Sequence, residues 1–185
     1  MNNKISNLLK TYLEPLSWTE KLSGIVQTVS VKEGLKDAPV DKTYPVSVNI
    51  TAEQGTKGAY LDLAPNSKKK SVLYFEDKGV SYVERLGSRL KFQSSLRLVC
   101  WLNLGMIGDV PGVSGDYVIA VIKALPTTPI QTADFVSIFI SGISQVERDV
   151  SIFSKYTYNE QALQYLMYPY DYFALDLTID FVIPC

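Results

Sequence analysis

Two carboxylates near the end of the chain, Asp176 and Asp180, have the spacing that most invites an acid–base interpretation. Both belong to Phe173–Ile183, a stretch in which apolar side chains take every odd position. On a β-strand the two acids would share one side and lie ~13 Å apart along it. Glycosidases hold their two carboxyl groups about 5–9.5 Å apart, so the spacing favours a solvated strand face over a catalytic pair.

Other residues that commonly carry catalysis or hold metals are scarce. The chain contains no histidine, which removes the commonest general base, the histidine-dependent triads and most zinc sites. It has no GxGxxG or GxxxxGK[ST] loop for phosphates, and "GDVPGVSGD" (108–116) matches no calcium loop. Cys100 has no visible base and is predicted to be a small core residue. We therefore predict no enzyme activity, no catalytic residue, no cofactor and no metal site.

The composition predicts a single domain over residues 1–185. Hydrophobic residues make up 46% of the chain and charged residues 20%, as in ordinary globular proteins. Two cysteines do not make a disulfide framework. The N-terminal "MNNKISNLLKTYLEPLSW" lacks the apolar core of a signal peptide. No apolar run reaches the ~18–20 residues of a membrane-spanning helix, so we expect no membrane partner and synthesis in the cytoplasm.

The apolar pattern predicts helices at both ends of a run of strands. Ile5–Leu16 carries one apolar stripe at helical spacing, and Tyr117–Leu125 carries a second that ends before Pro126. We also expect a short helix at Asn159–Leu166 and a loop over residues 32–42. The expected strands are Ile25–Val31, Tyr44–Ile50, Val72–Glu76, Val80–Leu86, Leu90–Leu104, Phe135–Val146 with a continuation at Val150–Ser154, and Phe173–Ile183.

Strands dominate this order and parallel βαβ alternation is absent, so the fold class is α+β. We expect a mainly antiparallel sheet with the N-terminal helix and the second helix packed on one face. Asp77–Gly79 is the expected hairpin turn. Leu90–Leu104 would extend ~50 Å, which predicts a bulge or a projecting arm within 66–104. Phe135–Val146, apolar on both faces at first, is expected to be central.

The closing strand gives a specific packing prediction. Leu175, Leu177 and Ile179 should be buried, and Asp176 and Asp180 should lie on the opposite face. We expect this last strand to pair with neighbours inside the sheet. Exposed sheet edges would offer a second use, the joining of sheets between copies.

Two clusters could bind a partner. Residues 66–97 carry eight Lys/Arg against three Asp/Glu, enough to meet phosphates or an acidic surface, or simply to form a solvated face whose lysines can be replaced without loss of folding. Residues 156–172 hold six of the twelve tyrosines, which suit an interface or local packing. The candidate partner-contact residues are Lys68, Lys69, Lys70, Arg85, Arg89, Lys91, Tyr168 and Tyr170.

Charge is unevenly distributed along the chain. Residues 1–100 carry 15 Lys/Arg and 10 Asp/Glu, a balance of +5, whereas residues 101–185 carry 3 and 9, a balance of −6. The two halves could neutralise each other within one fold. Alternatively, they could form complementary surfaces through which copies meet head to tail.

The order of elements resembles that of tail-terminator and tail-completion proteins of long-tailed phages, and of caps of phage-like contractile particles. The matching pieces are Ile5–Leu16, Val80–Leu104, Tyr117–Leu125, Phe135–Val146 and "YPYDYFALDLTIDFVI". The resemblance implies a ring-forming virion subunit, hexamer-like, whose partners are copies of itself and other tail or neck proteins. The extra length at residues 31–70 and the Tyr-rich insert depart from that pattern and could instead indicate another neck connector.

Two function classes remain after these observations. The first is a non-catalytic structural subunit of a phage or phage-like particle, a ring that caps or joins the tail. The second is a monomeric binding module whose basic hairpin contacts nucleic acid or another polyanion. Subunit mass in solution separates them, because the ring requires self-association.

Overall fold

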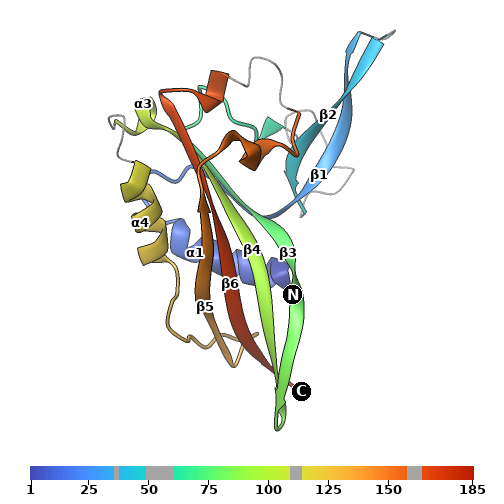
Figure 1. Ribbon diagram of the computed structural model, residues 1–185, viewed down its shortest axis with the longest axis vertical. Coiled ribbons are helices and arrows are strands. Elements are labelled where there is room, and N and C mark those ends of the chain that lie inside the picture. Colours follow the sequence, from blue (N-terminus) through green and yellow to red (C-terminus); the bar gives the residue numbers. More distant parts are fainter. Residues whose placement is uncertain (36–37, 49–60, 109–113, 158–163) are drawn as a thin grey trace.

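The computed structural model describes residues 1–35, 38–48, 61–108, 114–157 and 164–185 (Figure 1). Its helices and strands, in chain order, are α1 (Asn2–Leu13), β1 (Lys21–Leu35), β2 (Ala38–Ser47), β3 (Ser71–Leu86), β4 (Arg89–Asn103), α3 (Leu104–Ile107), α4 (Ser114–Ala124), β5 (Ser137–Glu147), the 3-10 turn η2 (Val150–Phe153) and β6 (Tyr170–Pro184). The described strands form one six-stranded sheet in the order β2-β1-β3-β4-β6-β5. Its ladders are antiparallel except that between β1 and β3. The predicted α+β class is confirmed.

The closing strand β6 lies inside the sheet, between β4 and β5, as expected. Its apolar odd positions, including Leu175, Leu177 and Ile179, are buried on the face that carries α1 and α4. Asp176 and Asp180 lie on the opposite face, where they bond to Arg97 and Gln93 of β4. The period-2 alternation of the sequence therefore assigned both faces correctly.

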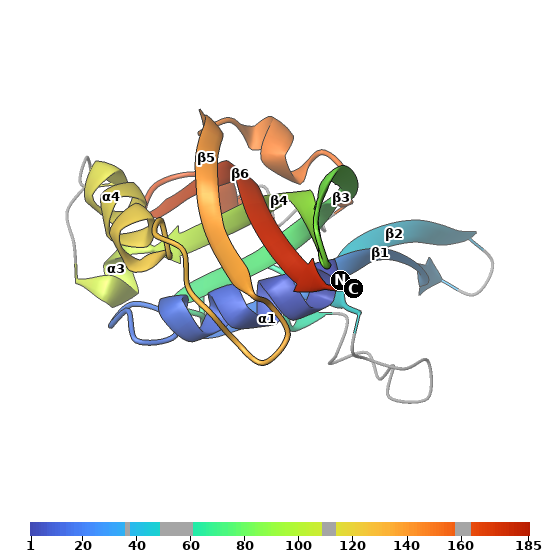
Figure 2. The ribbon, with the colours of Figure 1, turned by 90° about the horizontal axis from the view of Figure 1, so that it is seen from below.

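Helices cover one face of the sheet, and irregular segments cover part of the other (Figure 2). On the first face α1 packs on β1 and β3 and buries Ile5, Leu9 and Leu13 in the main core. On the second face η2 and the segment leading into β6 form a smaller aromatic core around Trp101. This second core covers only the part of the sheet nearest to β1 and α3, and leaves the remainder polar.

The region expected to turn at Asp77–Gly79 does not turn, and that prediction is wrong. β3 runs through it as a single strand whose register against β4 shifts between Asp77 and Val80. Gly79, with φ +110°, lies in the bulge that causes this shift. The chain reverses direction at Gly87, which has φ +62°. β3 and β4 consequently form one long hairpin, and its far end, Asp77–Lys91, is called the arm below (Figure 1).

Other local predictions also need correction. Residues 32–35 and 38–42 are strand, not loop, because β1 and β2 pair from Val26↔Ser47 to Leu35↔Ala38. Val150–Ser154 is not a strand: Asp149 caps the 3-10 turn η2 there. β5 is an edge strand, not a central one, and backbone bonds to Pro126 and Ile130 cover the first part of its outer edge. The helix expected at Asn159–Leu166 lies largely outside the described residues.

Replacing Leu177 with Ala tests the register of β6. This side chain is 1% exposed and packs in the main core. Its truncation should lower the free energy of unfolding by ~2–5 kcal/mol, as for other buried leucines. The matched control is Leu61→Ala, outside the arm, where 39% exposure predicts a much smaller loss. Urea denaturation of both variants checks this, and equal losses would show that β6 is misplaced.

Candidate functional site

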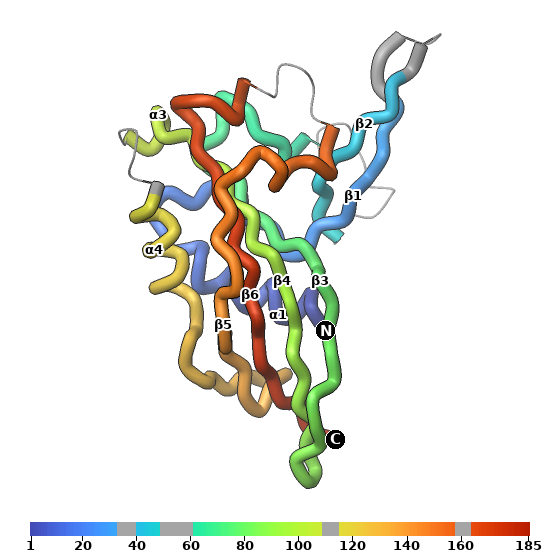
Figure 3. Tube along the Cα trace, in the orientation of Figure 1, coloured from blue at the N-terminus to red at the C-terminus, as the bar shows by residue number. Residues whose placement is uncertain are grey.

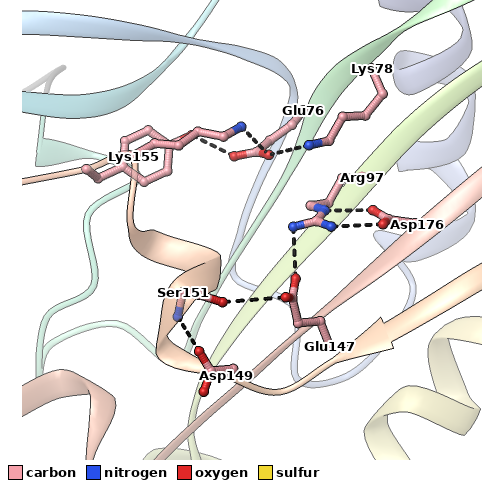
Figure 4. Close-up of polar contacts among 9 residues, drawn as sticks. Glu76, Lys78, Arg97, Glu147, Asp149, Ser151, Lys155 and Asp176 are labelled. Atoms are coloured by element: carbon pink, nitrogen blue, oxygen red, sulfur yellow. Dashed lines mark hydrogen bonds and ion pairs between the residues drawn. The ribbon is translucent and has the colours of Figure 1, made fainter.

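The two candidate acids of β6 lie on the open part of the sheet in two separate groups of polar contacts, and Figure 4 shows the group around Asp176. Arg97 lies directly opposite Asp176 in the β4–β6 register. Its Nε and Nη2 donate to the two carboxylate oxygens of Asp176 at 2.6 and 2.8 Å, and its Nη1 donates to Glu147 Oε2 at 2.9 Å. Asp180 accepts hydrogen bonds from Gln93 Nε2 at 3.0 Å and from Ser141 Oγ at 3.1 Å.

Arg97 holds the carboxylate of Asp176 in the ionised form. Hydrogen bonds from the Arg97 guanidinium hold the pKa of Asp176 below its ordinary value. The same contacts raise the pKa of Arg97, so the pair stays charged on both sides. A general acid needs the opposite shift, towards a protonated carboxyl group at neutral pH. The arrangement therefore fixes β4 to β6 and β5 and gives no support to an acid–base role.

Glu76 of β3 is a second anchor, and sequence reasoning missed it. Its carboxylate is buried, accepts a hydrogen bond from Tyr156 Oη at 3.0 Å and forms ion pairs with Lys155 and Lys78 (Figure 4). These contacts tie the segment after η2 to the sheet. The available signal was its position: Glu76 follows Val72 and Tyr74 at strand spacing, so it shares their buried face.

The lysines of the basic cluster have different environments. Lys69 is only 9% exposed, and its Nζ donates to the carbonyl oxygens of Leu61, Asp62 and Ala64. Burial lowers the pKa of Lys69 to about 8. Three acceptors require three N–H groups, which only the protonated amine supplies. The expectation that Lys69 lies on a solvated face is therefore wrong, because its ammonium group closes a turn.

The other basic candidates divide into bonded and unbonded groups. Lys70 Nζ donates to the Ser17 carbonyl oxygen at 2.6 Å, and Lys91 forms ion pairs with Glu84 and Asp180. Lys68 is exposed. Arg85 Nε donates to the Gly87 carbonyl oxygen, and neither Arg85 nor Arg89 has a carboxylate partner within the described part of the chain. Arg89 lines a shallow depression of about 330 Å³ beside Asp134 and Pro184.

The two tyrosine candidates, Tyr168 and Tyr170, have different environments. Tyr170 stacks on Trp101 with ring centroids 5.2 Å apart, and Tyr165 packs edge-on against both rings. Trp101 Nε1 donates to the Tyr165 carbonyl oxygen at 2.6 Å. Tyr168 is 68% exposed and stays available for a partner. Tyr170 contributes to the aromatic core of the second face instead.

The exposed large apolar side chains of β3 all lie in the arm. Four large apolar side chains within seven residues are 45–58% exposed: Val80, Tyr82, Val83 and Leu86. Tyr82 begins a chain of aromatic contacts on the α1 face, because it meets Phe92 at 5.6 Å and Phe92 stacks on Phe181 at 5.5 Å. Exposed apolar groups that continue a core in this way mark interaction surfaces.

The outer edge of the arm is unpaired among the described residues. β1 pairs with β3 only as far as Ile25↔Phe75 and then diverges from it with β2 (Figure 3). Register shifts interrupt β3 at Asp77/Val80 and Tyr82/Glu84, and β5 at Ile140/Gly142 and Ile143/Gln145. Bulges of this kind discourage the addition of another strand. Side chains, more than backbone pairing, are thus available for contacts at both edges.

Comparison with known proteins assigns the chain to no family. The sequence matches no protein-family model, and no significant match to a curated protein is found. Within the described residues, no group of three or more His, Cys, Asp or Glu side chains is placed to hold a metal ion. None of the described helices combines the length and apolar character needed to cross a membrane. Cys100 is fully buried, and burial raises the pKa of its thiol well above the usual value.

Asp176→Asn should lower stability and change its dependence on pH. The folded-state pKa of Asp176 lies below its unfolded value, so the stabilisation is present above ~pH 4 and is lost as pH falls through the folded pKa. At pH 7 we expect a loss of ~1–3 kcal/mol, because Arg97 loses a charged partner at a partly buried site. Asp116→Asn, which removes an exposed acid on α4, is the control. Identical acid denaturation of the wild type and Asp176→Asn would contradict the assignment.

Lys69→Met should destabilise the fold, whereas Lys68→Met should not. The first change leaves three carbonyl oxygens without their shared donor, which we expect to cost ~1–3 kcal/mol. The second replaces an exposed lysine, and such changes usually stay within ~0.5 kcal/mol. Thermal and urea unfolding of the two variants measure the difference. Equal stabilities would show that the three hydrogen bonds contribute nothing.

Proposed function

We propose that this chain is a non-catalytic structural subunit that assembles with copies of itself. The observation that carries the proposal is the arm, whose exposed apolar side chains lie beyond the cover of α1, on a strand whose outer edge has no partner strand among the described residues. A folded monomer gains nothing from leaving Tyr82 and Leu86 in water on one strand. A contact between subunits would bury them.

The kind of assembly is proposed from the order of elements. An amphipathic N-terminal helix, an antiparallel sheet, a helix between strands and a closing strand resemble phage tail-terminator and neck proteins. We propose a ring that caps or joins the tail of a phage or phage-like particle. Its subunits would assemble in the host cytoplasm and remain in the virion, in contact with other tail or neck proteins.

The alternative function, polyanion binding by a monomer, has less support from the arrangement of charges. Of the eight basic residues between 66 and 97, Lys69 and Lys70 bond to backbone carbonyls, and Lys78, Lys91 and Arg97 pair with carboxylates. Arg85 bonds to the carbonyl oxygen of Gly87 in the adjacent turn. In the described chain this leaves Lys68, Arg85 and Arg89 as the basic groups most available to a partner, which is few for a phosphate-binding surface.

Light scattering on a size-exclusion column tests the proposal. The wild type should elute as a multiple of 20.6 kDa, and negative-stain images should show rings. Tyr82→Ser with Leu86→Ser should shift the protein to a folded monomer. Val40→Ser with Val48→Ser, equally apolar and exposed on the other hairpin, should assemble as the wild type does. A wild-type monomer at every protein concentration, with salt-sensitive binding of DNA, would favour the alternative.

A further inference from the structure

The arm combines its apolar surface with uncompensated positive charge. Arg85 and Arg89 flank the turn of the hairpin and form no ion pair within the described chain. The carboxylate nearest in sequence, Glu84, already pairs with Lys91. We define the arm surface as Val80, Tyr82, Arg85 and Arg89. Val80, Tyr82 and Arg85 lie on β3 at the free edge of the arm, whereas Arg89 begins β4 just across the turn, opposite Pro184 of β6. All four residues lie at the same end of the sheet, near the tip of the hairpin (Figure 1).

A surface of the opposite character lies at the other edge of the sheet, where β5 leads into η2. Val146 and Val150 are each about half exposed there. Tyr172 packs on Phe153 of η2 with ring centroids 5.5 Å apart, which brings Asp171 beside the turn that Asp149 caps. Burial raises the pKa of the Tyr172 hydroxyl group, and the charges of Asp149 and Asp171 raise it further. Neither acid has a basic partner within the described chain, since Asp149 caps Ser151 N and Asp171 accepts from Tyr172 N. We define these four residues, Val146, Asp149, Val150 and Asp171, as the β5-end surface.

We propose that the arm surface of one copy binds the β5-end surface of the next copy. This inference rests on the proposed function and names the contact through which it would operate. Two apolar side chains and two unpaired charges of one sign face two apolar side chains and two unpaired charges of the other sign. Arg148, exposed beside Asp149, reduces the negative charge of the second surface and so weakens the contact.

The charges decide how the copies are arranged. Two arm surfaces repel each other, as do two β5-end surfaces, so a symmetric dimer through either one is disfavoured. A contact between different surfaces at opposite edges is heterologous, and repetition of such a contact closes a ring or grows a filament. Bulges in β3 and β5 keep backbone pairing from replacing this side-chain contact.

A charge-swap experiment tests the proposal. The arm variant is Arg85→Glu with Arg89→Glu, and the β5-end variant is Asp149→Lys with Asp171→Lys. Each variant alone presents two surfaces of the same sign and should self-associate at least about tenfold more weakly than the wild type. Mixed in equal amounts, the two variants should assemble again, because every contact in an alternating array then joins opposite charges. Light scattering gives the masses, and circular dichroism verifies folding.

Two further variants extend the test: one separates loss of contact from loss of folding, and the other removes an opposing charge. Asp149 caps η2, so Val146→Arg with Val150→Arg provides a second β5-end variant that leaves the cap in place. It should abolish assembly, and mixing with the arm variant should restore it. Arg148→Ser removes the opposing charge and should strengthen wild-type assembly several-fold at low salt, an effect that salt reduces.

The outcomes separate this inference from the proposed function. A wild type that assembles while both charge variants assemble equally well overturns the inference and leaves self-assembly intact. Folded monomeric variants that fail to assemble on mixing also overturn it, because the two surfaces would then not meet. A wild-type monomer at every concentration and salt overturns both. Restored assembly on mixing supports the paired surfaces.

Discussion

The pairing of β4 with β6 is the constraint on which the rest of the structure depends. The two strands pair in one uninterrupted register from Arg89↔Pro184 to Asn103↔Tyr170. Because side chains alternate between faces, this register places Leu96 opposite Leu177 on the α1 face and Arg97 opposite Asp176 on the other. A slip by one residue would bury the ionic network and expose the core.

The two faces of the sheet differ in composition: one forms the main apolar core and the other carries most of the ion pairs. On the α1 face, Asn2 of the helix bonds to Ser94 of β4, and the helix stripe closes the main core. Beyond the start of α1 the same apolar face continues through Phe92 to Tyr82, where none of the described helices covers it. The arm is exposed because the sheet is longer than the layer packed upon it.

Internal pairing uses most of the charge on the opposite face. Arg97, Asp176 and Glu147 neutralise one another, as do Glu76, Lys155 and Lys78. Among the described residues, Arg85 and Arg89 of the arm and Asp149 and Asp171 at the end of β5 form no ion pair. Charges left in this way contribute more to partner choice and rate of association than to folding, and this supports an assembly role for the protein over a catalytic one.

The sequence by itself determined the elements whose periodicity is strict. Three such patterns each predict an element and its buried face: the helical stripe at Ile5–Leu16, the helix at Tyr117–Leu125 and the alternation of Phe173–Ile183. An apolar period of 3.6 residues places one face of a helix in the core, and a period of 2 places one face of a strand there. Patterns without clear alternation misled: the sequence of residues 32–42 predicts a loop, yet residues 32–35 and 38–42 form strands because backbone pairing in a long hairpin does not require an apolar face. Gly79 permits a turn and a bulge equally.

Only the tertiary structure decided which charges are available to a partner. Lys68 and Lys69 are indistinguishable in a run of three lysines, but one is exposed and the other closes a turn with three carbonyl oxygens brought from residues 61–64. Likewise, Arg97 and Arg89 share one strand, and only Arg97 meets carboxylates on β5 and β6. Ion pairs join residues far apart in the chain, so their partners are fixed by strand order and register rather than by local sequence.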